Sequence, residues 1–198
     1  MPMIGMGTFG SDSFTADQVA EAVAGGIRAG YRMLDCAACY GNEKEIDAVL
    51  DLLRIPPAAC ESEFHPCFQQ KELLEYLNQK GIVSVAYMPI GSPRRPERDI
   101  VPEDVDDMAQ PDIVEIARKH GVNPAIIALK WALGRGTIPI PFSLHHYEDN
   151  LEATVTEPLT QEEMDQIATL ECGNRLVKGQ VFLWEGANDW HDLWDEYY

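Results

Sequence analysis

An acid and a phenol lie close together near the start of the chain, in the stretch D-C-A-A-C-Y-G-N-E that begins at Asp35 and includes Tyr40. The residues before it, 32–35, have the pattern of a short buried strand. Asn42 and Glu45 form the capping-box pattern that starts a helix. Asp35 is therefore expected at the carboxyl end of a strand, with Tyr40 in the loop beyond, where α/β folds gather their reactive groups. The spacing leaves a second interpretation open, in which Asp35 caps the turn and Tyr40 is a packing residue.

Two other patterns contain residue types that bind metals. Cys36 and Cys39 have the C-x-x-C spacing of redox and zinc centres, but no second pair follows at zinc-ligand spacing and no thioredoxin-like pattern surrounds them. His145 and His146 are adjacent, and neighbouring residues of a strand point to opposite faces of the sheet. We therefore expect no metal centre.

The elements that must position these groups alternate between strand and helix, which predicts an α/β domain. Thr15 and Gln18 form a capping box, and Gly81 and Gly121 are typical helix ends. Asn123 followed by proline is a typical helix start. Strands are predicted at 4–9, 32–35, 58–63, 84–88 and 137–140, and helices at 15–30, 42–55, 69–80, 112–120, from 123 onward and from 160 onward.

Composition restricts the class of protein. The formal net charge is −18, which argues against a nucleic-acid partner because nucleic acids require basic surfaces. No apolar run approaches the roughly eighteen residues needed to span a bilayer, and no basic-then-apolar leader precedes Met3. The five cysteines lack framework spacing. A cytoplasmic protein with reduced thiols and no membrane partner is expected.

Several motifs, in order, resemble those of the aldo-keto reductases. The amino-terminal run containing Gly5-Met-Gly7-Thr8-Phe9 and the tyrosine stretch described above resemble the first third of that family. The segment Glu63-Phe64-His65-Pro66-Cys67 resembles its E-C-H-P-Y motif, and Ala86-Tyr87-Met88-Pro89-Ile90-Gly91-Ser92 its A-Y-x-P-L-G-S motif. The resemblance implies a (β/α)₈ TIM-type barrel.

Such barrels typically need about 250 residues, whereas this sequence has 198. We therefore expect one truncated aldo-keto reductase-like domain over residues 1–198: an incomplete (β/α)₈ barrel that retains about five βα units. The expected helix 42–55 has one apolar stripe, but its first half resembles the helix after strand two and its second half the helix before strand six. This indicates an internal deletion near residues 47–48. The missing block would carry the family's catalytic lysine and histidine, neither of which has a matching residue here.

The same resemblance implies a nicotinamide cofactor, NADP or NAD. Glu61 stands where the family usually has a glutamine that holds the carboxamide, and His146 where an arginine often clamps the 2′-phosphate of NADP. Losing that fixed positive charge leaves the preference between NAD and NADP open. The positions matched to cofactor contacts are Gly7, Thr8, Phe9, Glu61, Tyr87, Ile90, Ser92, His146, Asp149 and Asn150.

Two further segments have both a functional and a plain interpretation. Residues 91–111 resemble the family's loop over the cofactor, and in that interpretation Arg94, Arg95 and Arg98 would contact its phosphates. The alternative is a loop exposed to solvent. The aromatic tail, residues 179–198, resembles the family's substrate loop. The alternative is that it forms a flap over the flank of the barrel.

The function implied by the resemblance is NAD(P)H-dependent reduction of aldehyde or ketone carbonyls, with a small carbonyl or sugar-like substrate. The cofactor would supply hydride and Tyr40 the proton, with Asp35 as the second catalytic residue. Activity is expected to be impaired, because a phenol near a carboxylate without the lysine is a poor acid at neutral pH. The alternative is a non-catalytic remnant that binds nucleotide or a partner and self-associates, as a homo-oligomer, through its open sheet.

Overall fold

The computed structural model describes residues 6–7, 15–30, 34–35, 58–91, 95, 97, 100–142, 146–180, 183 and 186–189. The chain divides into two compact units. The amino-terminal unit comprises Met1–Ala58 together with Lys178–Tyr198, and the sheet unit comprises Ala59–Val177. Each unit is described by itself below.

In the amino-terminal unit, two short strands and one helix are described. β1 (Met6–Gly7) and β2 (Leu34–Asp35) pair in parallel, with Gly7 opposite Asp35. Between them in the chain runs α1 (Ala16–Ala29), which begins at the predicted capping box and ends at Gly30 in the left-handed conformation. One face of α1 is buried, through Val19, Val23, Ala24 and Ile27.

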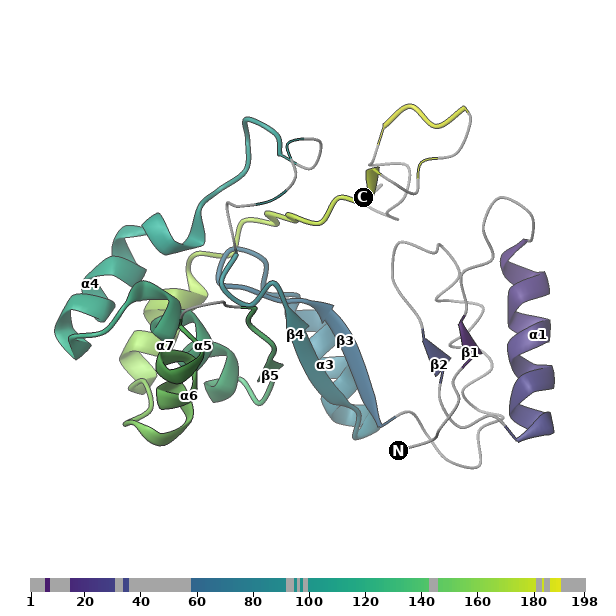
Figure 1. Cartoon of the computed structure of the whole chain (residues 1–198), viewed down its shortest axis with the longest axis horizontal. Coiled ribbons are helices and arrows are strands. Elements are labelled where there is room, and N and C mark those ends of the chain that lie inside the picture. Colours follow the sequence, from purple (N-terminus) through teal and green to yellow (C-terminus); the bar gives the residue numbers. More distant parts are fainter. Residues whose placement is uncertain are drawn as a thin grey trace. The chain divides into compact units, whose positions relative to one another are not determined.

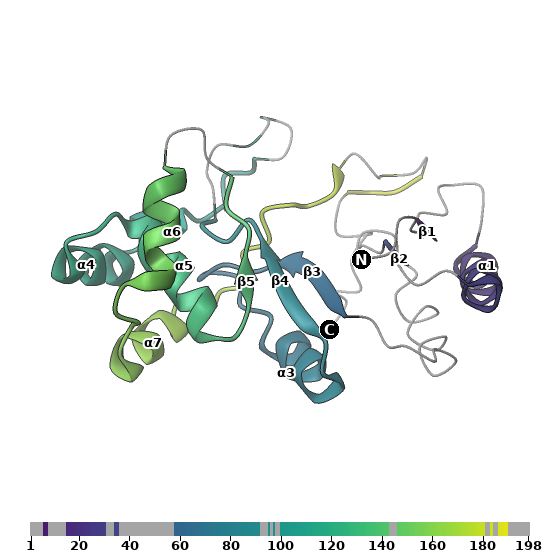
Figure 2. The same ribbon diagram turned by 60° about the horizontal axis from the view of Figure 1, so that its bottom comes forward.

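The sheet unit contains a three-stranded parallel sheet in the order β3, β4, β5. Its strands are β3 (Ala59–Glu63), β4 (Val83–Tyr87) and β5 (Ile138–Pro139). Helix α3 (Lys71–Lys80) connects β3 to β4 and lies along one face of the sheet (Figures 1 and 2). Phe64, Leu74 and Ala86 form the apolar contact beneath that face. The carboxyl ends of β3 and β4 therefore lie side by side, with Glu63 opposite Tyr87.

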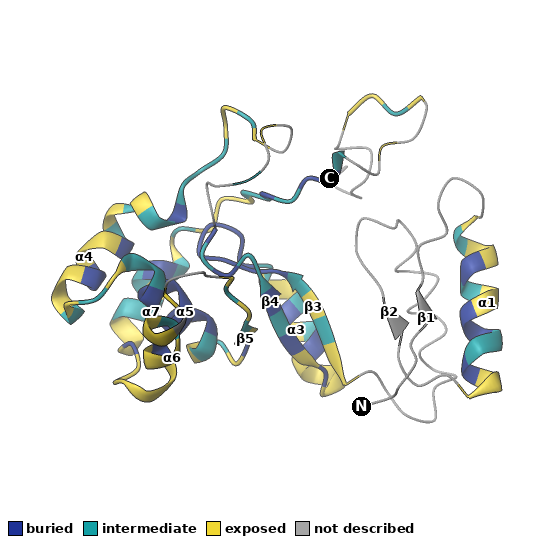
Figure 3. Ribbon diagram, viewed as in Figure 1, coloured by how far each residue is buried: buried dark blue, intermediate teal, exposed yellow. Residues whose placement is uncertain are grey.

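Helices pack together beside β5 (Figure 2). The 3₁₀ turn η4 (Asp107–Ala109) leads into α4 (Pro111–His120), α5 (Pro124–Gly134) follows, and α6 (Tyr147–Val155) and α7 (Gln161–Ala168) come after β5. α5 is the central helix and is buried on nearly every side, as its apolar sequence requires (Figure 3). Its Trp131 is 1% exposed and lies in the largest core cluster, with residues of α4 and α7.

All five predicted strands coincide with observed strands, although the ends differ. β5 is shorter than predicted, because Pro139 and Pro141 have no N–H to donate to the sheet. Helix α6 was not predicted: its apolar residues Leu151 and Val155 are exposed, so no buried stripe marks it. The predicted helix 42–55 lies outside the described residues.

Candidate functional site

Glu61 and Tyr87, both matched to nicotinamide contacts, lie on neighbouring strands, with Glu61 in the middle of β3 and Tyr87 at the carboxyl end of β4. Glu61 is opposite Val85, and Tyr87 is two residues further along β4, so alternation along the strands puts both side chains on the same face. Helix α3 covers the other face through Ala86. Glu61 is exposed and Tyr87 is half-buried. The structure therefore brings these two predicted residues together on the face away from α3.

The residues matched to the adenine end lie at the start of α6. His146 is the N-cap residue of that helix, and its Nδ1 lies 3.1 Å from Oδ2 of Asp149. The Asn150 amide donates to the carbonyl of His146. Ile90, just after β4, packs against the apolar cluster formed by α5 and α6. The packing of Ile90 connects the carboxyl end of β4 to the helix that carries His146, Asp149 and Asn150.

A buried network of charged groups extends from the end of β3. Glu63, His65 and Asp107 are each 1% exposed or less. The imidazole Nε2 of His65 lies 3.1 Å from Oε1 of Glu63, and Nδ1 lies 2.9 Å from Oδ2 of Asp107. A carboxylate oxygen faces each ring nitrogen, and only the doubly protonated ring can donate at both. His65 is therefore an imidazolium between two carboxylates.

The pKa of His65 agrees with this geometry. Burial alone lowers the pKa of the imidazole, but the hydrogen bonds to Asp107 and Glu63, together with their negative charges, raise it to about 9. The charged ring therefore persists throughout the neutral range. It is also fully engaged, so His65 is not available as a general acid or base for a substrate.

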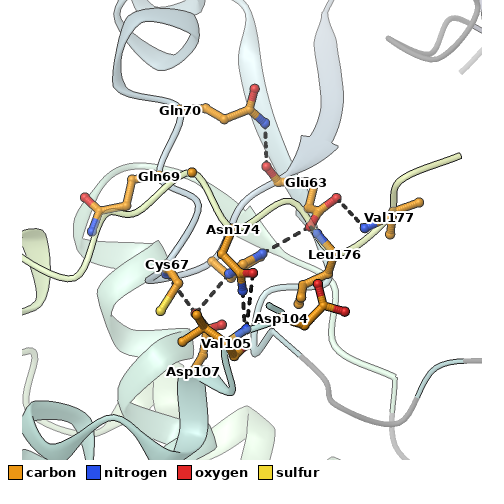
Figure 4. Close-up of polar contacts among 12 residues, drawn as sticks. Glu63, Cys67, Gln69, Gln70, Asp104, Val105, Asp107, Asn174, Leu176 and Val177 are labelled. Carbon is orange, nitrogen blue, oxygen red and sulfur yellow. Dashed lines mark hydrogen bonds and ion pairs between the residues drawn. The ribbon is translucent and has the colours of Figure 1, made fainter. Parts of the chain in front are cut away.

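Glu63 also holds the segment that follows α7 (Figure 4). Its two carboxylate oxygens accept hydrogen bonds from the amides of Leu176 at 2.6 Å and Val177 at 3.0 Å. Asn174 is bound as well, since its amide donates to the Cys67 carbonyl and its side chain exchanges hydrogen bonds with the backbone of Val105. Residues 174–177 are thus attached both to the β3 end and to the segment before α4.

Asp107 is enclosed from several sides. Its Oδ2 accepts from the Cys67 amide at 2.8 Å in addition to its contact with His65. Its Oδ1 is buried without a hydrogen bond among the described residues. A Cβ at Gly91 would lie 2.1 Å from that Oδ1, and Gly91 has a φ of +53°.

Burial, followed by the charge of Asp107, raises the pKa of the Cys67 thiol, so this cysteine is not a nucleophile.

Among the arginines of the segment 91–111, Arg95 lies within the described residues. It forms an ion pair with Asp104, and the two side chains are only 7% and 10% exposed. The solvated-loop interpretation is therefore wrong for Arg95, and a phosphate would have to compete with Asp104 for the guanidinium. Arg94 and Arg98 lie outside the described residues.

For the predicted catalytic pair, the structure describes the backbone of one member. Asp35 is the last residue of β2, as predicted, and lies opposite Gly7 in the register of the sheet. The remaining predicted site residues, Thr8, Phe9, Tyr40 and Ser92, lie outside the described residues. Cys36, Cys39 and His145 also do.

The network of Glu63, His65 and Asp107 was missed by the sequence analysis. One signal could have found part of it: Glu63 and His65 are two residues apart in an extended stretch, which puts them on the same side of the strand. Asp107 lies 42 residues beyond His65, in an acidic run that resembles a solvated segment. Nothing local distinguishes it from its acidic neighbours.

Comparisons with known proteins identify the family. The family model for the aldo/keto reductase family matches residues 44–171. An aldo/keto reductase of Synechocystis sp. is 37% identical over 156 residues, which cover 77% of this chain and 47% of that protein. Aldo-keto reductase family 1 member A1 of Xenopus tropicalis is 34% identical over 137 residues, which cover 69% of this chain and 41% of the relative. The chain belongs to the aldo/keto reductase family, and it spans less than half the length of these relatives.

Two features are absent from the described residues. No helix there is long and apolar enough to cross a membrane. Nor does that part of the chain contain a group of three or more His, Cys, Asp or Glu side chains that could hold a metal ion.

Proposed function

We propose that this chain binds a nicotinamide dinucleotide and is an oxidoreductase of the aldo-keto reductase type that reduces small aldehyde, ketone or sugar-like carbonyls with low activity. The observation that carries the proposal is the placement of Glu61 and Tyr87 on one face of neighbouring strands, with Tyr87 at the carboxyl edge of the sheet. This edge is where parallel α/β folds bind their ligands. Family membership supports the same site.

The residues present are compatible with a nicotinamide. The Tyr87 ring lies on the face of the sheet that α3 leaves uncovered, where it would stack on a planar ring. Glu61 is an acceptor only and would receive the carboxamide N–H₂. When bound, the dinucleotide supplies hydride chemistry.

We propose that NADH binds more tightly than NADPH. The first turn of α6 contains Glu148 and Asp149, so the position expected for a 2′-phosphate carries two acids. His146 is already engaged with Asp149. A further phosphate would therefore be repelled at this position rather than clamped.

Tyr40 would donate the proton to the alkoxide that forms from the carbonyl. In the described part of the chain, His65 is locked between carboxylates, and the other histidines also face acids: His120 lies 2.8 Å from Glu163, and His146 faces Asp149. Each of these imidazoles is thus engaged with a carboxylate. Loss of general acid–base assistance typically costs about 10²- to 10⁴-fold in rate. We therefore propose slow turnover.

The test is a calorimetric titration with NADH and NADPH, followed by a turnover assay with a small aldehyde. We expect saturable binding, with NADH bound more tightly than NADPH. We also expect slow oxidation of NADH by the aldehyde, and this turnover should disappear in the Tyr40→Phe variant. Turnover unchanged by Tyr40→Phe would contradict the role of the phenol. Absence of binding by a folded chain would contradict the proposed function.

We propose, again from family membership, that the chain forms an incomplete (β/α)₈ barrel. A three-stranded parallel sheet is what a partial (β/α)₈ barrel would contain, and the proposed internal deletion near residues 47–48 accounts for the missing strands. A cytoplasmic location remains part of the proposal, because the family's chemistry uses soluble cofactors.

A second candidate function is favoured by the edge of the sheet. Ile138, Ile140 and Phe142 alternate along β5 and its continuation and are 51%, 45% and 85% exposed. Among the described strands, β5 pairs only with β4, so its other edge would be open to another strand. The alternative is thus a non-catalytic chain that self-associates here. Light scattering tests it: a dimer that Phe142→Asp converts to monomer, together with nucleotide binding and no turnover, would favour this candidate.

A further inference from the structure

We infer that Glu63, His65 and Asp107 form a positioning junction that holds two functional segments in one arrangement: the end of the segment between β4 and α4, and residues 174–177, which lead into the tail. The first segment resembles the family's loop over the cofactor, and residues 174–177 precede the stretch that resembles its substrate loop, so this inference rests on the proposed function. The three side chains are positioning residues, not catalytic ones.

The hydrogen bonds of the network connect two distant parts of the chain. Asp107 belongs to η4, and Leu176 and Val177 lie 69 and 70 positions further along the chain, yet both places are bound through the same imidazolium. The path runs from Asp107 to His65 at 2.9 Å, to Glu63 at 3.1 Å, and to the Leu176 amide at 2.6 Å. A parallel path runs from Asp107 through the Cys67 peptide to Asn174.

The imidazolium has one positive charge between two carboxylates, and all three groups are almost completely buried. Removing one partner from such a set leaves an uncompensated buried charge, which is far more costly than losing an exposed pair. A change at Asp107 should therefore reach Glu63 and the amides it holds, because these groups share the charge of His65.

The two carboxylates contact the ring nitrogens of His65 directly. Other charged or titratable groups near the network include the Cys67 thiol, the Cys172 thiol and Arg175. Arg175 lies 4.6 Å from the centroid of the Phe68 ring, and that ring lies 6.0 Å from the imidazole. The guanidinium thus packs over the Phe68 ring. The state of the junction depends on Glu63, His65 and Asp107.

The test compares Asp107→Asn with Ile116→Val in the full chain. Asparagine keeps the size and one acceptor oxygen but removes the charge, whereas Ile116 is fully buried in the helical cluster, of which none of the three junction residues is a member. We expect hydrogen exchange at the Leu176 and Val177 amides to accelerate at least about tenfold in Asp107→Asn but not in Ile116→Val. Equal protection of these amides in the two variants would overturn the inference.

A measurement on the unsubstituted chain decides the matter if Asp107→Asn does not fold. Nuclear magnetic resonance would follow the His65 ring and the amides of Cys67, Leu176 and Val177 as pH rises from 7 to 10. One shared midpoint is expected at all four residues. Amides that remain constant while the ring titrates would overturn the junction.

The nucleotide readout separates this inference from the proposed function. Asp107→Asn should weaken NADH binding about tenfold, whereas Ile116→Val, destabilised by packing alone, should bind as the unsubstituted chain does. Equal NADH affinities in both variants would overturn the positioning role. If the unsubstituted chain binds no NADH, the proposed function fails, and the exchange and resonance results still decide whether the two segments are coupled.

Discussion

At the residue scale, the most informative side chain is His65. Its sequence context shows a histidine in a family motif, but not the two carboxylates that determine its state. Glu63 lies at the end of β3, two residues before His65, whereas Asp107 lies in the turn before α4. The local half of this network could be predicted from the E-x-H spacing. The other half required the fold, because a carboxylate 42 residues away has no local signature.

The charge of His65 predicts how stability depends on pH. The folded pKa of about 9 lies above the value of 6.5 for an unperturbed imidazole. Stability from this group is therefore fully present below pH 6.5 and is lost as pH rises through 9. The difference between the folded and unperturbed pKa values corresponds to about 3 kcal/mol in the free energy of unfolding. Urea unfolding at pH 6, 8 and 10 should show this loss.

The control for that series is His65→Gln, which has no charge to lose. The variant should be less stable at pH 6 but should lack the additional decline between pH 7 and 10. If both proteins lose stability in parallel over this interval, the decline comes from other groups and the assignment of His65 as imidazolium is wrong.

At the element scale, local signals located helices and strands well where the end residues carry their own chemistry. The capping box at Thr15 is present, and the helix predicted from residue 160 onward also begins at a capping box, formed by Thr160 and Glu163. Gly81 and Gly121 end α3 and α4 in the left-handed conformation. Helix α6 was missed because packing against α5 through Ala153, rather than a clear apolar stripe, accounts for its buried contact.

Gly91 shows a close approach between elements, and its substitution is predictable. Gly91→Ala should destabilise the chain by about 2 kcal/mol or more, because a left-handed residue with a Cβ costs about 1 kcal/mol and the Cβ would also collide with Asp107. Gly121→Ala is the matched control: it has a φ of +67° and open space around the new atom. Thermal unfolding of both variants measures the difference. Equal destabilisation would mean that Asp107 moves aside at no cost.

At the scale of the whole molecule, the sheet unit contains the larger part of the core. Three of the four apolar clusters recorded for the described residues lie entirely within Ala59–Val177. The predicted alternation of strand and helix describes this unit well. The division into two units was not evident from sequence, because the predicted helix 42–55 suggested a continuous connection between the strands on either side of it.

The sheet unit should therefore fold by itself. A fragment of residues 59–177 is expected to show helical circular dichroism and one cooperative thermal transition. Trp131→Ala in the same fragment should abolish or greatly lower that transition, since truncating a buried tryptophan typically costs about 3–5 kcal/mol. A fragment that is unfolded without the substitution would show that residues 1–58 or 178–198 are required for folding.

The central claim is that this chain binds a nicotinamide dinucleotide at the carboxyl edge of its sheet. The most direct measurement is the dissociation constant of NADH for the unsubstituted chain, for Tyr87→Phe and for Tyr87→Ala, each checked for its fold by circular dichroism. We predict saturable binding that Tyr87→Phe retains, because the ring remains, and that Tyr87→Ala weakens at least about tenfold. Equal affinity in all three folded proteins, or no saturable binding by the unsubstituted one, would contradict the claim.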